Sequence, residues 1–178
     1  MPDPERKVPT LTTERLVLRP LSELDIPAWF ARASDRDAAS LAGDPVPDSI
    51  AAGEEWLARS RRNLASGARL QWGIDRREGP QSIGTISLNM GAPGGAAALG
   101  FVLGRAFWGQ GLATEAAQEI LRYAFEVLEL RQVEAQAISR NFQSLRILAK
   151  LGFVHINSDI DGSDGEPFQQ FSLRPPRP

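Results

Sequence analysis

The segment GFVLGRAFWGQGLAT, residues 100–114, decides how the rest of the chain is interpreted. Its apolar start, Phe101–Leu103, is typical of a strand, and Gly109 and Gly111 mark a tight turn before a helix that begins near Leu112. Glycine has no Cβ atom, so backbone N–H groups in such a turn can approach an anion closely. The first turn of a helix adds unpaired N–H donors and about half a positive charge. The segment therefore predicts a phosphate-binding turn that needs no lysine.

Two common phosphate-binding motifs do not fit this turn. A Walker loop requires GxxxxGK[ST], and the chain contains no such run. A dinucleotide fingerprint requires GxGxxG, whereas Gly109-Gln110-Gly111 is followed by Leu112-Ala113-Thr114. Taken alone, the pair of glycines is equally compatible with an ordinary strand-to-helix turn.

Composition places the chain among single-domain proteins. It has 178 residues, 42% of them hydrophobic, and a formal net charge of −2, which gives no reason to expect nucleic-acid binding. The absence of cysteine excludes disulfides, thiolate metal sites and a cysteine nucleophile, and it favours a cytoplasmic location. A single histidine, His155, argues against a histidine metal site, so no metal is expected. No apolar run is long enough to span a membrane, and the first ten residues lack the apolar region of a secretory signal.

Apolar periodicity predicts the order of the elements. Alternating positions indicate strands at residues 16–19, 70–74, 86–90, 97–103, 132–138, 153–156 and 168–173. Helical spacing indicates helices at residues 25–33, 50–66 and 112–128, with a short helix after Asn141 that Gly152 ends. Residues 35–47 and 157–167 are expected to be loops.

This order predicts an α+β fold with a mixed, mostly antiparallel sheet of about seven strands and helices on both faces. We expect one domain, residues 11–174, between a flexible tail at residues 1–10 and a second tail at residues 175–178.

The central segment and its neighbours resemble the GNAT acetyltransferases. The runs that carry the resemblance are GFVLGRAF (100–107), WGQGLATEA (108–116) and NFQSLRILAKLGF (141–153). The family signature Q/R-x-x-G-x-G/A falls on Trp108, Gly111 and Ala113, with tryptophan where many members carry glutamine or arginine. Together with LTTERLVLRPLSELD at residues 11–25, these runs are most similar to the branch that acetylates N-terminal amines of ribosomal proteins. The resemblance implies the GNAT fold, in which strands 97–103 and 132–138 splay apart to form a V-shaped cleft.

The resemblance also implies an activity. The chain would transfer an acetyl group from acetyl-CoA directly to a primary amine, either a protein N-terminus or a small molecule, in a ternary complex. The pantetheine arm would lie along strand 97–103, and the diphosphate would lie at the glycine turn. The implied cofactor-binding residues are Phe101, Val102, Leu103, Trp108, Gly109, Gln110, Gly111, Leu112, Ala113, Thr114, Asn141 and Ser144.

The implied catalytic residue is Ser144. Many relatives place a tyrosine one turn beyond this serine as the acid for the leaving thiolate, but that position is Leu148 here. Our hypothesis is that Ser144 donates a hydrogen bond or proton to the departing sulfur. Asn141 is equally well explained as a plain helix N-cap.

The general base and the acceptor pocket are not marked by any motif. Candidate bases are Glu14 and the acidic residues Asp159, Asp161, Asp164 and Glu166, although a solvated charged loop is the simpler interpretation of the last four. Five aromatic residues could line the acceptor pocket or belong to the core: Trp29, Phe30, Trp56, Trp72 and Phe142.

Three functions compete at this point. The first is the N-acetyltransferase, acting as a monomer or homodimer; the identity of its amine and acyl groups is left open. The second is a catalytically weak GNAT-like module that binds coenzyme A as a sensor or interaction surface. The third is a nucleotide-binding α/β protein, which NAD or ATP would stabilise against heat.

Overall fold

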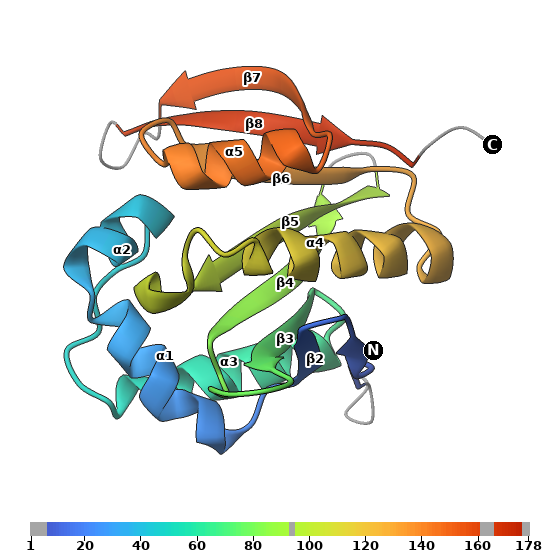
Figure 1. The fold of residues 1–178 in the computed structure, drawn as a ribbon. Coiled ribbons are helices and arrows are strands. Elements are labelled where there is room, and N and C mark those ends of the chain that lie inside the picture. Colours follow the sequence, from blue (N-terminus) through green and yellow to red (C-terminus); the bar gives the residue numbers. More distant parts are fainter. Residues whose placement is uncertain (1–6, 93–94, 161–165, 176–178) are drawn as a thin grey trace.

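The computed structural model describes residues 7–92, 95–160 and 166–175. Within these residues the chain forms one eight-stranded sheet in the order β1-β2-β3-β4-β5-β6-β8-β7 (Figure 1). Only the β5–β6 pair is parallel. The strands are β1 (Leu11–Thr12), β2 (Leu16–Pro20), β3 (Arg69–Arg76), β4 (Gly84–Ala92), β5 (Ala96–Leu103), β6 (Val133–Ile138), β7 (Val154–Ile160) and β8 (Pro167–Leu173). The predicted α+β class is confirmed, with the short β1 as the additional strand.

Helices cover both faces of the sheet. They are α1 (Ile26–Ala33), α2 (Arg36–Ala42), α3 (Ala52–Ala65), α4 (Leu112–Arg122) and α5 (Phe142–Lys150), and one turn of π-helix, Tyr123–Val127, continues α4. Ser60 of α3 donates to Gln71 of β3 (3.0 Å), whereas the neighbouring Trp72 packs edge-on against Tyr123 at 5.8 Å. Because successive side chains of a strand point to opposite faces, α3 and α4 lie on opposite sides of the sheet. None of the helices in the described ranges is both long and apolar enough to cross a membrane.

The main core lies between α4 and the sheet. Trp72, Leu16 and Leu88 are fully buried, and small residues of α4, Ala116 and Ala117, let that helix approach the strands closely. This face also holds part of the segment expected to be a flexible tail, residues 1–10. Val8 is 4% exposed, and the carbonyl of Pro9 accepts a hydrogen bond from the indole of Trp72 at 2.8 Å. The prediction of a flexible tail is therefore wrong for Val8 and Pro9, which pack against the main core. Residues 1–6 and 176–178 lie outside the described residues.

Two expected loops contain regular structure. Residues 36–42 form α2, because the Asp35 carboxylate accepts from the Ala38 N–H (3.2 Å) and Gly43 ends the helix at φ 72°. A helix of seven residues, about two turns, is too short to show a clear apolar periodicity, although its Asp and Gly caps are visible in the sequence. Residues 157–160 extend β7, where pairing with β8 overrides their polar composition. Residues 161–165, within the second expected loop, lie outside the described residues.

The sheet divides in the middle. β5 and β6 pair only from Ala97–Leu99 to Val133–Ala135, after which β5 continues beside β4 and β6 continues beside β8. The predicted splay is confirmed, and it gives residues 100–103 of β5 one edge without a neighbouring strand.

Candidate functional site

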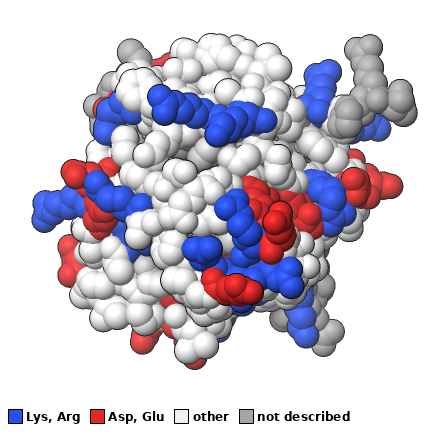
Figure 2. All heavy atoms as spheres, viewed as in Figure 1, with Lys and Arg blue, Asp and Glu red and all other residues white. Residues whose placement is uncertain are grey.

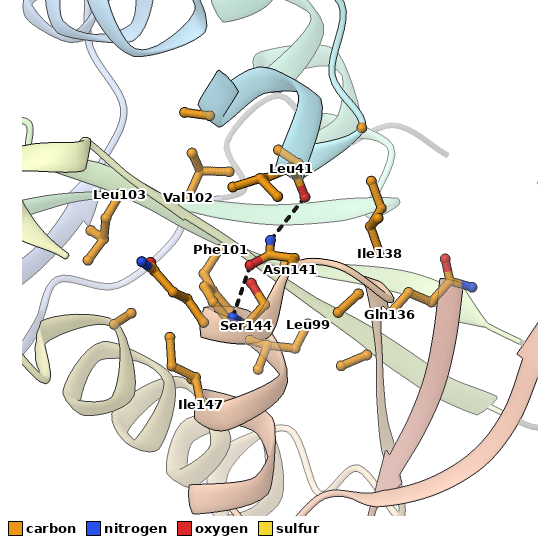
Figure 3. A pocket seen from close by; sticks show the side chains of 18 of the residues that line it. Leu41, Leu99, Phe101, Val102, Leu103, Gln136, Ile138, Asn141, Ser144 and Ile147 are labelled. Carbon is orange, nitrogen blue, oxygen red and sulfur yellow. Dashed lines mark hydrogen bonds between the residues drawn. The ribbon is translucent and has the colours of Figure 1, made fainter. Parts of the chain in front are cut away.

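A cleft of about 1080 Å³ lies where β5 and β6 separate. One half is lined by β5, the start of α4 and the α5 residues Ser144, Ile147 and Lys150. The other half is lined by α2 and the two residues after it, by residues of β3, β4, β6, β7 and β8, and by Glu166. We call these the α4 half and the α2 half. Figure 3 shows residues from both halves converging on the cleft.

The glycine turn of the α4 half has the conformation that the sequence predicts for an anion site. Gly109 and Gly111 adopt φ of 72° and 76°, a region in which residues with a Cβ are strained. A Cβ added at Gly109 would meet no atom within 4 Å, so the turn is open to the cleft. The first backbone bond of α4 runs from Glu115 N–H to Gly111 C=O (3.0 Å), so the N–H groups of residues 112–114 precede it and point out of the helix end. The turn therefore fits a diphosphate.

Positive side chains adjoin this turn. Figure 2 shows Lys and Arg side chains gathered over α5, which carries Arg146 and Lys150 one turn apart, and both line the cleft. Lys150 also shares a shallower hollow of about 320 Å³ with Gly111 and Thr114. The electrostatic surroundings of the helix start therefore favour an anion.

A carboxylate that sequence reasoning missed fixes the turn in place. Glu115 accepts from Thr13 Oγ1 (2.5 Å), from the Arg15 N–H (2.8 Å) and from Arg15 Nε (2.6 Å). Arg15 Nη1 in turn donates to the carbonyl of Gln110 (3.0 Å). Burial would raise the pKa of Glu115, but these hydrogen bonds outweigh it and hold the pKa below its usual range. No local pattern joins positions about a hundred residues apart, so only the fold could show this contact.

The unpaired edge of β5 faces the cleft. The carbonyl of Leu103 accepts from Trp108 Nε1 at 2.8 Å, so the edge at this residue points away from β4. Alternate residues of a strand direct their backbone groups to the same edge, so the groups of Phe101 also point there. The side chain of Leu103 is buried in the core, while its carbonyl points to the open edge of the strand.

Nearly all of the predicted cofactor-binding residues line the cleft: Phe101, Val102, Leu103, Trp108, Gly109, Gly111, Leu112, Ala113, Thr114, Asn141 and Ser144. Gln110 does not. Its amide donates to the carbonyl of Ala106 (2.9 Å) and its own carbonyl is held by Arg15, so it stabilises the turn from outside.

Asn141 has two structural roles. Its Oδ1 accepts from the Ser144 N–H (3.1 Å), which is the helix N-cap, and its Nδ2 donates to the carbonyl of Leu41 in α2 (2.9 Å; Figure 3). Arg140 adds bonds to Ser40 and an ion pair with Glu166. These contacts hold α2 against the end of β6, so α2 forms a wall of the cleft.

The candidate bases are scattered. Asp159 and Glu166 line the cleft, whereas Glu14 lies in the shallower hollow beside α4. Asp161 and Asp164 lie outside the described residues. A further carboxylate, Asp44, lines the α2 half at a position that was expected to be loop.

Of the two alternatives for the five aromatic residues, acceptor pocket or core, the first does not hold: none of Trp29, Phe30, Trp56, Trp72 and Phe142 lines the cleft. Trp29 and Trp56 stack on each other between α1 and α3 (5.2 Å), and Trp72 is in the core. Phe142 is 65% exposed. Phe107 and Phe168 line the cleft instead.

Comparisons with known proteins agree on one family. A model of the acetyltransferase (GNAT) domain matches residues 15–154. The chain is 30% identical to the uncharacterized N-acetyltransferase p20 of Bacillus licheniformis over 145 residues, which cover 81% of this chain and 82% of that protein. It is 29% identical to the uncharacterized N-acetyltransferase YoaA of Bacillus subtilis over 146 residues, 82% of each chain.

Solved structures share the fold. A GNAT acetyltransferase from Bacillus anthracis superposes with a TM-score of 0.82 at 19% identity, covering 93% of this chain and 98% of that one. Spermidine N-acetyltransferase from Vibrio cholerae, in complex with CoA and spermine, gives 0.78 at 16% identity over 91% and 96% of the two chains. Ribosomal-protein-S5-alanine acetyltransferase from Vibrio fischeri gives 0.80 at 19% identity over 94% and 97%.

Proposed function

The chain belongs to the GNAT acetyltransferase family, and we propose that it transfers the acetyl group of acetyl-CoA directly to a primary amine bound in the same cleft. The observation that carries this proposal is the unpaired edge of β5 beside the glycine turn, both of them lining one cleft. Acetyl-CoA supplies the acetyl group as a thioester. The α4 half would hold the diphosphate at residues 109–114 and the amide-containing arm at residues 101–103 by strand-like pairing.

Two protons have to move in this reaction. The acceptor nitrogen forms an amide bond with the acyl carbon as the carbon–sulfur bond breaks, so the nitrogen loses a proton and the sulfur needs one. We propose that Ser144, which lines the α4 half near the start of α5, donates a hydrogen bond to the departing thiolate, which then takes its proton from solvent. Its N–H is held by Asn141, which orients the first turn of that helix and leaves the hydroxyl for the cleft. The N–H groups of β5 that face the splay would hold the acyl oxygen.

The free-energy cost of removing a proton from the acceptor ammonium group favours acceptors whose amine is weakly basic. Neutralising an α-amino group of pKa near 8 costs about 1.4 kcal/mol at pH 7, whereas a lysine amine costs roughly 4 to 5 kcal/mol. We therefore propose an α-amine or a comparable small amine as acceptor. The fold likeness to ribosomal-protein-S5-alanine acetyltransferase supports the branch that modifies N-terminal amines, and the likeness to spermidine N-acetyltransferase keeps polyamines as a second candidate.

Release of free thiol from acetyl-CoA, measured with a panel of amino acids, dipeptides and spermidine, tests the proposal. Mass spectrometry of each mixture should show one acceptor class gaining an acetyl group. Binding of coenzyme A without turnover on any amine would favour the CoA-binding module instead. Stabilisation against heat by NAD or ATP, but not by coenzyme A, would favour the nucleotide-binding protein.

A further inference from the structure

A cation lies in the α2 half of the cleft with few protein partners. Arg69 belongs to β3, on the sheet face opposite Leu70 and Trp72, and it lines the cleft. Its Nη2 donates to Ser87 Oγ (2.9 Å). Its Nε is buried and finds no hydrogen-bond partner among the described residues. Such an orphaned donor is uncommon in a folded protein and indicates that something else completes the site.

The charge of Arg69 is also poorly compensated. Burial lowers the pKa of its guanidinium, the positive charge of Arg59 lowers it further, and Asp44 opposes these effects only in part. Within the described ranges no carboxylate forms an ion pair with Arg69, although ten such pairs occur elsewhere in the molecule. A partly buried cation whose charge is only partly offset is stabilised by an anionic ligand, and a planar guanidinium suits a carboxylate.

The guanidinium lies close to the strand that would carry the acyl group. Ser87, to which it donates, is directly opposite Gly100 of β5. A Cβ added at Gly100 would lie 3.3 Å from Ser87 Oγ. Because residue 100 is a glycine, no side chain at this position covers the hydroxyl of Ser87, and both residues line the cleft. Gly100 is followed at once by Phe101, whose backbone faces the splay. An anion on Arg69 would therefore lie on the side of the cleft next to the part of β5 that we propose holds the acyl group.

The other charged side chains of the α2 half are carboxylates, which suit a positively charged group on a ligand whose anionic group is bound by Arg69. Three carboxylates line it, those of Asp44, Asp159 and Glu166; Glu166 is paired with Arg140, and Asp159 also has an interaction within the chain. Carboxylates favour an ammonium group before it loses its proton, whereas Arg69 opposes a second cationic group. The α2 half therefore carries both positive and negative charges, and this combination fits a zwitterion better than a polyamine.

We propose that the acceptor is a primary amine that carries a carboxylate a few bonds away, and that Arg69 binds this carboxylate. This inference rests on the proposed acetyl transfer and narrows its substrate class. Two sources share the chemistry: a free amino acid, and a peptide whose first residue is Asp or Glu.

Matched pairs of amines test the proposal. Acetylation rates and heats of binding are measured, with coenzyme A present for binding, for glycine and glycinamide, β-alanine and its amide, γ-aminobutyrate and its amide, and peptides that begin with Glu or Gln. We expect the carboxylate member of at least one pair to show a KM at least tenfold lower than its amide. The pair that shows the largest ratio identifies the spacing and the source.

Variants assign this preference to one side chain. Arg69→Gln should raise KM for the carboxylate member at least tenfold and leave KM for the amide and for acetyl-CoA within about twofold, whereas Arg69→Lys should keep part of the preference. The matched control is Arg59→Gln, which removes a nearby exposed charge outside the cleft and should leave the ratio unchanged. Since the partly buried charge of Arg69 is only partly compensated, the Arg69→Gln variant should have an unfolding temperature at or above that of the wild type. A purely structural role of Arg69 predicts a lower unfolding temperature for the variant.

The outcomes separate the two proposals. Turnover on amides or spermidine with no preference for carboxylates, or a preference that survives Arg69→Gln, would overturn the role of Arg69 but leave acetyl transfer intact. If no amine is acetylated, acetyl transfer fails, and the heat of binding of the carboxylate amines to wild type and to Arg69→Gln still decides whether Arg69 holds an anion.

Discussion

The two halves of the cleft differ in the chemical groups that form their surface. The α4 half consists largely of backbone groups in one continuous segment, residues 101–114, shaped by glycines at positive φ. The α2 half consists of side chains from separate strands and a short helix, such as Arg69, Asp44 and Glu166. A backbone site can bind one common group in many proteins, whereas a side-chain site can differ in each. If the α4 half binds the acyl donor and the α2 half the acceptor, as we propose, this difference would let one shared donor be combined with different acceptors.

The two halves also rest on different supports. The α4 half is anchored by Glu115 and Arg15, a pair whose side chains are 17% and 41% exposed. The α2 half shares its sheet face with a buried network, in which Arg19 bridges Asp25 and Asp75 across the space above Gly73. Burial would raise the pKa of Asp25, but hydrogen bonds from Arg19, Ser82 and the Ser22 N–H outweigh it and hold the pKa below its usual range.

The largest effect is expected in the buried network. Asp25→Ala leaves the charge of Arg19 with one carboxylate fewer in a buried place, and it should lower the free energy of unfolding by about 3–5 kcal/mol. Urea denaturation followed by circular dichroism measures the loss. The control is Glu23→Ala in the same helical turn, which removes an exposed ion pair with Arg61 and should cost about 0.5 kcal/mol or less. Equal losses in the two variants would show that the network does not support this face.

The glycine turn gives the next largest effect. Gly111→Ala places a Cβ at φ 76° and should cost roughly 1–2 kcal/mol of stability. Because the change also shifts the N–H groups at the start of α4, we expect KM for acetyl-CoA to rise about tenfold or more, with KM for the amine little changed. Gly67→Ala is the matched control, since Gly67 has φ 74° and lies outside the cleft. A similar rise in KM for acetyl-CoA in both variants would contradict a backbone-built donor site.

Ser144→Ala tests the one side chain that we place at the reacting atoms of the α4 half. Loss of its hydroxyl should lower kcat by roughly 10- to 100-fold, a modest effect because a thiolate is a fair leaving group. The pH profile of kcat is the measurement, and Gln143→Ala, on the same helix turn, is the control. Unchanged turnover of Ser144→Ala over the whole pH range would remove this role.

The smallest effect concerns the anchor at Glu115. The pKa of this carboxyl is lower in the folded chain than in an unfolded one, so the anchor contributes stability that is fully present above the usual carboxyl pKa and is lost as pH falls from there through the lowered folded pKa. Glu115→Gln should therefore be less stable than wild type by about 1 kcal/mol or less at pH 7, and this difference should shrink steadily as the pH is lowered below the usual carboxyl pKa. Thermal unfolding over a series of pH values measures this. A difference that does not shrink with falling pH would mean that the carboxylate charge is not what holds the turn.

Several features of the fold could be predicted from local sequence. The alternation at Leu70, Trp72 and Ile74 identified β3 because one face of that strand lies in the core. The glycines of residues 109–111 and the cap at Asn141 identified the start of α4 and of α5, because each needs only its nearest neighbours. The same reasoning missed α2, because this helix is short and its cap, the bond from the Ala38 N–H to the Asp35 carboxylate, gives the same sequence pattern as a turn in a loop.

The proposed acceptor side of the site was not predictable in this way. Glu14 and five aromatic residues were candidates by residue type, yet none of them lines the cleft. No local pattern marks Arg69, because the alternation that predicts β3 concerns the opposite, apolar face of that strand. The significance of Arg69 depends on Ser87 and Gly100, which pair across two neighbouring strands.

By itself the sequence determined the order of the strands and helices and the position of a glycine turn before a helix, because these follow from contacts between residues close in the chain. Tertiary structure alone decided that Glu115 meets Arg15, that α2 closes against Asn141, and that Arg69 lines the cleft with a buried Nε that has no hydrogen-bond partner among the described residues. Each of these depends on which distant segments become neighbours. That choice is made by burial of the whole core, which no short stretch of sequence encodes.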